Sequence, residues 1–259
     1  MRAPESGISN IGDFPDIAAS ILERLRARRP RIHCITNAVA QNLTANVLLA
    51  VGALPSMTIS RDEVGAFAGS ADALMVNLGT FDSERRDAVR LALDAVAQTG
   101  RPWMLDPVLI DRSPQRAGFA HALLADSPAA VRMNAAEFAV LAGGKSPSAF
   151  AVATGSVAAI TAQIDEITDG TRTTRIGNGH PLMAQVTAMG CAASALVAAS
   201  LSVEEDRQQA VAAAILLFGA AGDIAGEAAN GPGSFGVHIL DALYNLDRTQ
   251  LRQRAKVMS

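Results

Sequence analysis

HPLMAQVTAMGCAASALVAAS, at residues 180–200, joins an extended segment to an uncharged helix through a tight turn. We expect a strand or extended segment up to Val186, and an Ala-rich helix without Pro, Gly or charge from Cys191 onward. A strand that turns directly into a buried helix leaves several backbone N–H groups unpaired at the positive end of the helix dipole. Because such a point binds anions well, residues 187–190 are predicted to form an anion site.

Cys191 lies in the first turn of this predicted helix. The field of a helix N-terminus favours a thiolate, so we expect the thiol pKa to lie below its usual value of about 8.5. Two interpretations follow: a catalytic base beside a phosphate site, or a small buried hydrophobic residue that begins a core helix. On this segment alone the second interpretation is favoured.

The composition predicts one globular domain over residues 1–259, with a loose lead-in at residues 1–15. Hydrophobic residues make up 49% of the chain and charged residues 18%, which is typical of a protein with a large core. The net charge of −3 provides no general attraction to nucleic acid or to an anionic membrane. Cys34 and Cys191 are far apart and have no metal-type spacing, which favours reduced thiols and a cytoplasmic location.

Strands and helices are predicted to alternate before this stretch, which indicates a mostly parallel sheet with helices on both faces. The expected strands span 31–36, 54–59, 73–78, 102–105 and 130–133, and the expected helices 17–28, 38–51, 62–68, 83–99, 113–124 and 135–142. Residues 149–176 look like short strands with turns at 154–155 and 169–170, which predicts an antiparallel edge. Helices are expected at 191–201, 206–229 and 237–246, with GPGSFG at 231–236 separating the last two.

Ligands of open parallel sheets bind outside the carboxyl ends of the strands. Several residues are predicted at or just beyond those ends: Asn37, Met57, Asn77, Asp106, Arg132, Asn134, Glu137, Thr154 and Cys191. If the sheet is parallel, these residues converge on one edge.

Asp106 and Glu137 are the candidate ligands for Mg²⁺. Asp106 precedes a proline and is equally compatible with an ordinary turn. Asn134 and Glu137 have the spacing of a helix capping box, which is the simpler explanation for that pair alone. Together the two carboxylates suit Mg²⁺, which accompanies substrate phosphates through one or two carboxylates and water. Arg132 beside them has the donor geometry of a phosphate ligand, although a surface arginine is the alternative.

Seven segments, in this order, resemble the hydroxyethylthiazole kinase family of the ribokinase-like superfamily. They are HCITNAVAQNLTANVLLAVGALPSM (33–57), LMVNLGTF (74–81), WMLDPV (103–108), VRMNAAEF (131–138), ATGSV (153–157), GNGHPLMAQVTAMGC (177–191) and GPGSF (231–235). The resemblance implies a ribokinase-like three-layer α/β fold with an antiparallel edge. It also implies transfer of the γ-phosphoryl of ATP to the primary hydroxyl of 4-methyl-5-(2-hydroxyethyl)thiazole in thiamine biosynthesis or salvage, by a homotrimer with interfacial sites.

The resemblance also implies residue roles, which we carry over position by position. Cys191 occupies the place of the catalytic base. ATP and its phosphates are assigned to Arg132, Thr154 and Gly190. The thiazole is assigned to Met57 and Ala188, with Asn37 and Asn77 as further candidates. Mg²⁺ is assigned to Asp106 and Glu137, partly through water.

Three departures from the family pattern keep other functions open. Ala188 and Met133 stand where family members usually have glycine, and an extra helix before the ATGSV segment is not expected, so that 135–142 alone would form the crossover. One alternative is a kinase for a related small alcohol, such as a hydroxymethylpyrimidine or a sugar. The other is a catalytically silent relative that binds a thiazole or nucleotide.

Overall fold

The structure is a computed structural model that describes residues 11–258. A nine-stranded sheet in the order β2-β1-β3-β4-β5-β6-β7-β8-β9 forms its centre. The strands are β1 Arg31–Ile35, β2 Leu54–Ser56, β3 Ala73–Asn77, β4 Trp103–Asp106, β5 Ala130–Asn134, β6 Val157–Thr161, β7 Asp165–Thr168, β8 Thr173–Ile176 and β9 Val257–Met258. The pairs from β2 to β6 are parallel, and the pairs from β6 to β9 are antiparallel. The mostly parallel sheet and its antiparallel edge are therefore confirmed.

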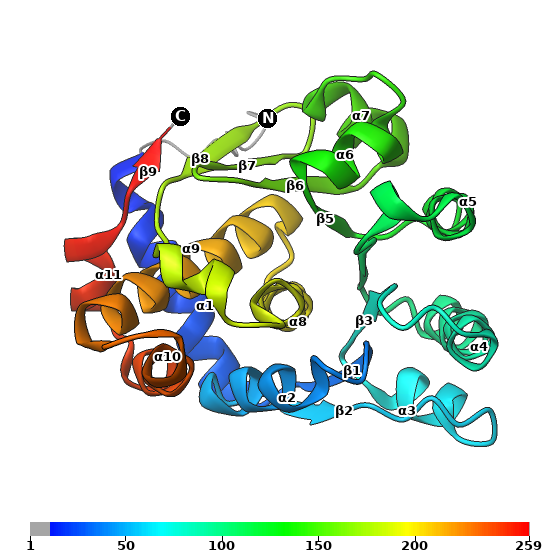
Figure 1. The fold of residues 1–259 in the computed structure, drawn as a ribbon, viewed down its shortest axis with the longest axis horizontal. Coiled ribbons are helices and arrows are strands. Elements are labelled where there is room, and N and C mark those ends of the chain that lie inside the picture. Colours follow the sequence, from blue (N-terminus) through cyan, green and yellow to red (C-terminus); the bar gives the residue numbers. More distant parts are fainter. Residues whose placement is uncertain (1–10, 259) are drawn as a thin grey trace, which may run out of the picture.

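Helices cover both faces of the sheet, as Figure 1 shows. On one side lie α1 Phe14–Arg28, α2 Gln41–Ala50, α8 Met189–Leu201, α9 Arg207–Ala228, α10 Pro232–Asn245 and α11 Arg248–Arg254. On the other lie α3 Val64–Ser70, α4 Ser83–Thr99, α5 Pro114–Leu124, α6 Ala135–Ala142 and α7 Pro147–Thr154. Short 3-10 helices span Ile11–Asp13, Ile110–Arg112 and Pro181–Gln185.

The helix α8 lies at the centre of the molecule because its side chains are small and uncharged. All of its residues except Gly190 are buried, between the sheet and α9. The helix α9 is long and apolar enough to cross a membrane, but 78% of its apolar window is buried within the protein. Its apolar sequence is therefore accounted for by packing against α8, α1 and α10.

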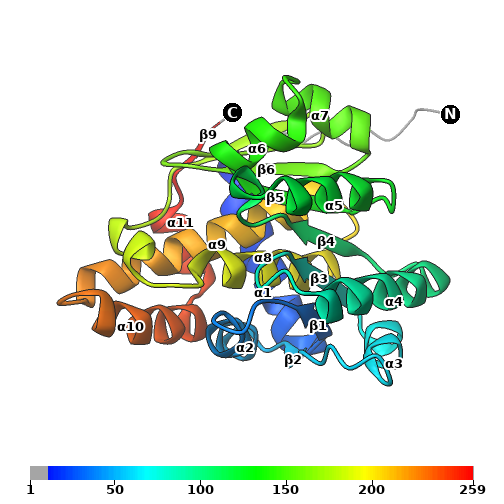
Figure 2. The same ribbon diagram turned by 45° about the vertical axis from the view of Figure 1, so that its right-hand side comes forward.

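Several predicted elements are wrong. Residues 149–154 belong to α7, not to a strand, because Pro147 occupies the first turn and the Ser146 hydroxyl accepts a hydrogen bond from the Ala149 N–H. The crossover between β5 and β6 therefore contains two helices, α6 and α7, which lie beside β6 in Figures 1 and 2. Residues 181–185 form a 3-10 helix in place of a strand or extended segment. Pro181 begins this helix, and the His180 side chain caps it by accepting a hydrogen bond from the Leu182 N–H.

The two ends of the chain also differ from the prediction. Of the predicted lead-in, residues 1–10 lie outside the described part, whereas 11–15 already belong to a 3-10 helix and α1. The GPGSFG segment does not separate two helices, because Pro232 begins α10 within it. The elements α11 and β9 were not predicted, and β9 pairs with β8 to complete the sheet.

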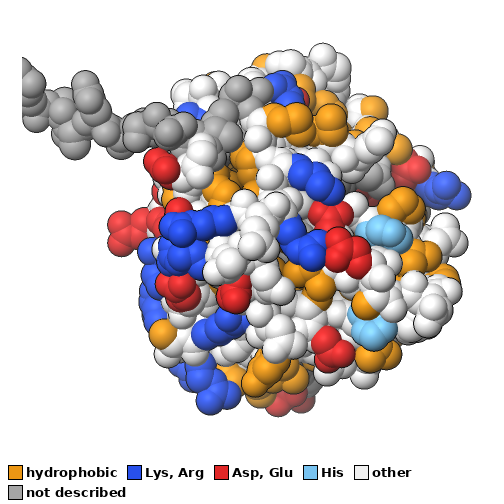
Figure 3. Space-filling view, turned by 90° about the vertical axis from the view of Figure 1, so that its left-hand side faces the viewer, with side chains coloured by type: hydrophobic (Ala, Val, Ile, Leu, Met, Phe, Trp, Pro, Cys, Tyr) orange, Lys and Arg blue, Asp and Glu red, His pale blue; other side chains and the backbone are white. Residues whose placement is uncertain are grey.

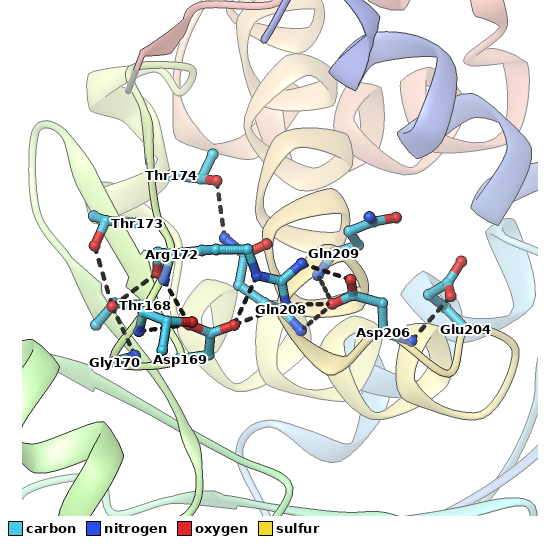
Figure 4. A network of polar contacts seen from close by, with 11 residues as sticks. Thr168, Asp169, Gly170, Arg172, Thr173, Thr174, Glu204, Asp206, Gln208 and Gln209 are labelled. Atoms are coloured by element: carbon cyan, nitrogen blue, oxygen red, sulfur yellow. Dashed lines mark hydrogen bonds and ion pairs between the residues drawn. The ribbon is translucent and has the colours of Figure 1, made fainter. Parts of the chain in front are cut away.

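A polar network ties the antiparallel edge to the start of α9 (Figure 4). Arg172, in the turn between β7 and β8, pairs with Asp169 at 2.7 Å and with Asp206 at 2.6 Å. Asp206 also caps α9 by accepting from the N–H groups of Gln208 and Gln209. One guanidinium therefore fixes the β7–β8 turn to the helix that supports α8.

Candidate active site

Cys191 lies in the first turn of α8, at the edge where the parallel strands end. Its Sγ accepts hydrogen bonds from two amide groups, Asn77 Nδ2 at 3.3 Å and Asn37 Nδ2 at 3.4 Å. Asn37 is held by its own turn, because its Oδ1 accepts from the Ala40 N–H. The helix predicted for residues 38–51 begins only at Gln41, and Asn37 lies in the turn before it, where it faces the sulfur.

The thiol pKa differs from the prediction in direction. The Cys191 side chain is only 8% exposed, and burial, followed by the charge of Asp106, raises the pKa of the thiol to about 12. The expected decrease is wrong because loss of solvation and a nearby carboxylate outweigh the helix N-terminus and the two amide donors. Cys191 is consequently a neutral thiol at neutral pH.

Asp106 is buried between the sheet and α8. The register of β3 and β4 places Asn77 opposite Asp106, and Asn77 Nδ2 donates to Asp106 Oδ2 at 2.7 Å. Ser194, one turn after Cys191 on α8, donates to the same oxygen at 2.9 Å. Burial raises the pKa of Asp106, while Arg132 and these two donors oppose the increase. Ser194 was not predicted, although its position three residues after Cys191 places both on one face of the helix.

Arg132, on β5, extends toward the start of α8. Its Nη2 donates to Thr161 Oγ1 at 3.2 Å, and Thr161 in turn donates to the carbonyl of Met133. Gly190 makes room for the guanidinium, because a Cβ added there would lie 3.0 Å from Arg132 Nη1. The Arg132 Nε is buried and has no hydrogen-bond partner among the described residues. Arg132 lines both cavities described below, so its guanidinium lies at the predicted anion site.

Glu137 serves the capping box that its spacing predicts. Its Oε2 accepts from the Asn134 N–H, and its own N–H donates to Asn134 Oδ1, both at 2.9 Å. Its Oε1 accepts from the Leu109 N–H at 2.9 Å, so the carboxylate also holds the loop after β4. Burial raises the pKa of Glu137, and the two backbone donors oppose that increase. The capping box predicted for Asn134 and Glu137 is confirmed. Glu137 also lines the cavity described next.

Two adjoining cavities meet at Arg132, Thr161 and Gly190. The first, about 500 Å³, is the Cys191 cavity, which is also lined by Asn37, Asp106, Glu137, Ala188 and Cys191. The second, about 590 Å³, is the Phe218 cavity, which is also lined by Asp165, residues 177–181 and Phe218. Among the described residues no group of three or more His, Cys, Asp or Glu side chains is arranged to hold a metal ion by itself.

Three predicted site residues line neither cavity. Asn77 is buried beside them, where its amide contacts Asp106 and Cys191. Thr154 ends α7 before β6 begins, so it lies at the opposite edge of the sheet, where its hydroxyl donates to the Phe150 carbonyl. Its predicted place at a strand end is wrong, and Thr161 at the end of β6 occupies the position at the site. Met57 follows β2 at the correct edge, but it is half-buried against the core and lines neither cavity in a single chain.

Ala188 precedes α8 with a φ of 70°. This left-handed conformation favours glycine and costs a residue with a Cβ about 1 kcal/mol. Met133 does not disturb the site, because it is buried on the opposite face of β5, in the core beneath α6 and α7. Of Ala188 and Met133, the two residues expected to replace a glycine, only Ala188 therefore lies at the site.

Comparison with known proteins gives consistent matches. A model of the hydroxyethylthiazole kinase family matches residues 22–148 and 145–249. A probable hydroxyethylthiazole kinase of Agrobacterium fabrum is 43% identical, over 95% of this chain and 97% of its own. The hydroxyethylthiazole kinase of Klebsiella pneumoniae strain 342 is 44% identical, over 89% of this chain and 96% of its own.

Solved structures agree with these sequence matches. The hydroxyethylthiazole kinase protein from Pyrococcus horikoshii OT3 superimposes with a TM-score of 0.90 at 34% identity, over 94% of this chain and 98% of its own. A ribokinase-like superfamily protein from Enterococcus faecalis V583 has a TM-score of 0.64 at 11% identity, over 96% of this chain and 92% of its own, which shows the ribokinase-like fold alone. The chain belongs to the hydroxyethylthiazole kinase family.

Proposed function

We propose that this chain, as one kinase domain, transfers the γ-phosphoryl of ATP to the primary hydroxyl of 4-methyl-5-(2-hydroxyethyl)thiazole. Family membership supports the reaction, and one observation supports the assignment of each cavity to a substrate. Arg132 lies where the two cavities meet, beside Gly190 at the start of α8. A phosphoryl group in transfer must lie between its donor and its acceptor, so we assign the Phe218 cavity to ATP and the Cys191 cavity to the alcohol.

Arg132 and the first N–H groups of α8 would hold the transferring phosphoryl group. The N–H groups of the first helical turn have no intrahelical partner, and the helix dipole adds to their attraction for an anion. The Arg132 guanidinium, which lines both cavities, would add donors from the side of β5. Such positioning and charge neutralisation supply most of the catalysis in phosphoryl transfer.

Mg²⁺ fits this site as a companion of the phosphates. Both side-chain donors to Asp106 among the described residues bind Oδ2, which leaves Oδ1 available. Each oxygen of Glu137 accepts one backbone N–H and retains a further lone pair. One or two carboxylates with water suffice for Mg²⁺ when phosphates complete its coordination. The ion supplies neutralisation of triphosphate charge when bound.

Cys191 would orient the hydroxyl of the acceptor as a neutral thiol. Its raised pKa makes it a poor base before ATP binds, and an added anion would disfavour the thiolate further. Asn37 and Asn77, which already donate to Sγ, would hold the sulfur in place, and Asn37, which lines the cavity, would offer a polar contact to the alcohol. The rate then depends on orientation more than on proton abstraction.

The lining of the Cys191 cavity combines apolar and polar side chains. Val39, Val108, Leu109 and Ala188 contribute apolar surface that suits a thiazole ring, and Asn37, Asp106 and Glu137 contribute polar groups. The choice of the thiazole over a sugar alcohol is therefore supported by family membership and not by the lining alone. A hydroxymethylpyrimidine remains the second candidate acceptor.

The assembly and location belong to the same proposal. We infer a homotrimer with interfacial sites, in which Met57 reaches the substrate of a neighbouring subunit, and a cytoplasmic location. Met57 lies at the carboxyl edge of β2 yet lines neither cavity of its own chain, which is consistent with a role across an interface. Light scattering of the purified protein would measure the assembly, and a monomer that is fully active would overturn this part.

The deciding experiment measures ADP release from Mg-ATP with and without the hydroxyethylthiazole. We expect release only when the alcohol is present, and release with a hydroxymethylpyrimidine in its place at a much lower kcat/KM. If the thiazole raises the melting temperature but no ADP forms, the chain is a silent binding protein and the kinase assignment is wrong.

A further inference from the structure

We propose that Asn178, Asp223 and Lys256 position one wall of the Phe218 cavity, so that the C-terminal end of the chain sets the affinity for ATP. The inference rests on the proposed function, because it takes this cavity as the nucleotide site. Its starting point is residues 177–180, which line the cavity as an irregular segment without a helix or strand of their own. Something outside the segment must therefore hold it in place.

Asn178 is the centre of these contacts and is buried, at 7% exposed. Its Nδ2 donates to Asp223 Oδ2 at 2.7 Å and to the carbonyl of Arg254 at 2.8 Å. Its Oδ1 accepts from the Lys256 N–H at 2.7 Å. The amide thus joins the cavity segment to α9 on one side and to the last residues of the chain on the other.

Asp223 binds the same segment at a second point. Its Oδ1 accepts from the Gly179 N–H at 3.2 Å, while its Oδ2 accepts from Asn178 and pairs with Lys256 Nζ at 3.1 Å. The close approach to α9 depends on Gly219, because a Cβ there would lie 2.7 Å from the Asn178 carbonyl oxygen. The position of the cavity wall is therefore determined by α9 and by the C-terminal residues together.

The C-terminal strand completes the attachment. The Gly177 N–H donates to the Lys256 carbonyl at 2.8 Å, beside the pairing of β8 with β9. The face formed by α10, α11 and β9 is shown in Figure 3, where Lys and Arg side chains lie among Asp and Glu. Most ion pairs on such a surface contribute little, but the pair of Lys256 with Asp223 contacts a buried network that lines a cavity.

The test compares Asp223→Ala and Lys256→Met with the control Glu227→Ala. Glu227 lies one turn after Asp223 on α9, pairs with Arg254 on the surface and makes no described contact with residues 177–180. We expect KM for ATP to rise about ten-fold in Asp223→Ala and about three-fold in Lys256→Met, from the loss of one or two charge-assisted hydrogen bonds. KM for the alcohol and kcat should stay within about two-fold of the parent, and Lys256→Arg and Glu227→Ala should match the parent in all three constants.

Two results would overturn the inference. One is an unchanged KM for ATP in an Asp223→Ala variant whose cooperative unfolding shows that it is folded. The other is a parallel rise of KM for both substrates. If Asp223→Ala does not fold, Lys256→Met and its Lys256→Arg partner decide the outcome. Calorimetric titration with ADP separates this inference from the proposed function. A parent protein that binds ADP but shows no thiazole-dependent turnover refutes only the kinase assignment, whereas equal Kd values for ADP in parent and variants refute the positioning role.

Discussion

Gly190→Ala should raise stability and lower activity, because the same Cβ affects the two properties in opposite directions. The added Cβ would lie 3.0 Å from Arg132 Nη1 and 3.4 Å from Nη2. Contacts of this kind are optimal at about 3.5–4.0 Å, so the guanidinium must move away from α8 by a few tenths of an ångström. That movement weakens its bond to Thr161 and takes its donors away from the transferring phosphoryl.

The expected loss of kcat/KM is about ten-fold, or about 1.4 kcal/mol of transition-state stabilisation. Alanine within a helix is favoured over glycine by about 0.5–1 kcal/mol, so the free energy of unfolding should rise by up to that amount. Steady-state ADP release with saturating alcohol and a urea unfolding curve measure the two quantities on the same preparation.

Gly118→Ala is the matched control for this experiment. Gly118 lies within α5, and a Cβ there would meet nothing within 4 Å. We expect this variant to gain similar stability at unchanged kcat/KM. Should Gly190→Ala behave like Gly118→Ala, with full activity, the placement of Arg132 at the phosphoryl group would be refuted.

Three further predictions concern the site and its surroundings. Cys191→Ala should fold normally and lower kcat by about ten-fold, and Cys191→Asp should retain activity; full activity of the alanine variant in the ADP assay would remove Cys191 from the mechanism. Leu109 has a φ of 61° and is 47% exposed, so Leu109→Gly should raise the free energy of unfolding by about 1 kcal/mol in urea, whereas a decrease would contradict the cost assigned to that conformation. Burial lowers the pKa of His33 from 6.5 to about 4, so the unfolded chain binds more protons than the folded chain between these pH values. The free energy of unfolding should fall by up to about 3 kcal/mol from pH 6.5 to 4, and an equally steep fall in His33→Phe would show that another group is responsible.

Much of the fold could be predicted because strand and helix periodicities are local properties. The helix α4 begins and ends at the predicted residues, Ser83 and Thr99, since its apolar spacing and the Asp82 cap lie within the segment itself. The α7 segment was misassigned because its sequence, FAVAT, has no period that separates a short buried helix from a strand. The Pro147 that begins it was the available signal.

Part of the candidate site could also be predicted from the sequence. Asn77, Asp106 and Arg132 follow from a parallel sheet, because the carboxyl ends of its strands meet at one edge. Thr161 was missed because the preceding strand was placed too early in the sequence. Ser194 was missed because a serine inside an apolar helix has no recognisable purpose until its partner is known.

The sequence by itself determined the alternation of strands and helices, the polar residues at the strand ends, the capping box at Glu137 and membership of the family. These features depend on residues that are close together along the chain or on motifs in a set order. Only the tertiary structure decided the raised pKa of Cys191, the support of Asp106 by α8 and the attachment of residues 177–180 to the C-terminal strand. Each of these depends on desolvation and hydrogen bonds between segments far apart in sequence, and no local pattern encodes them.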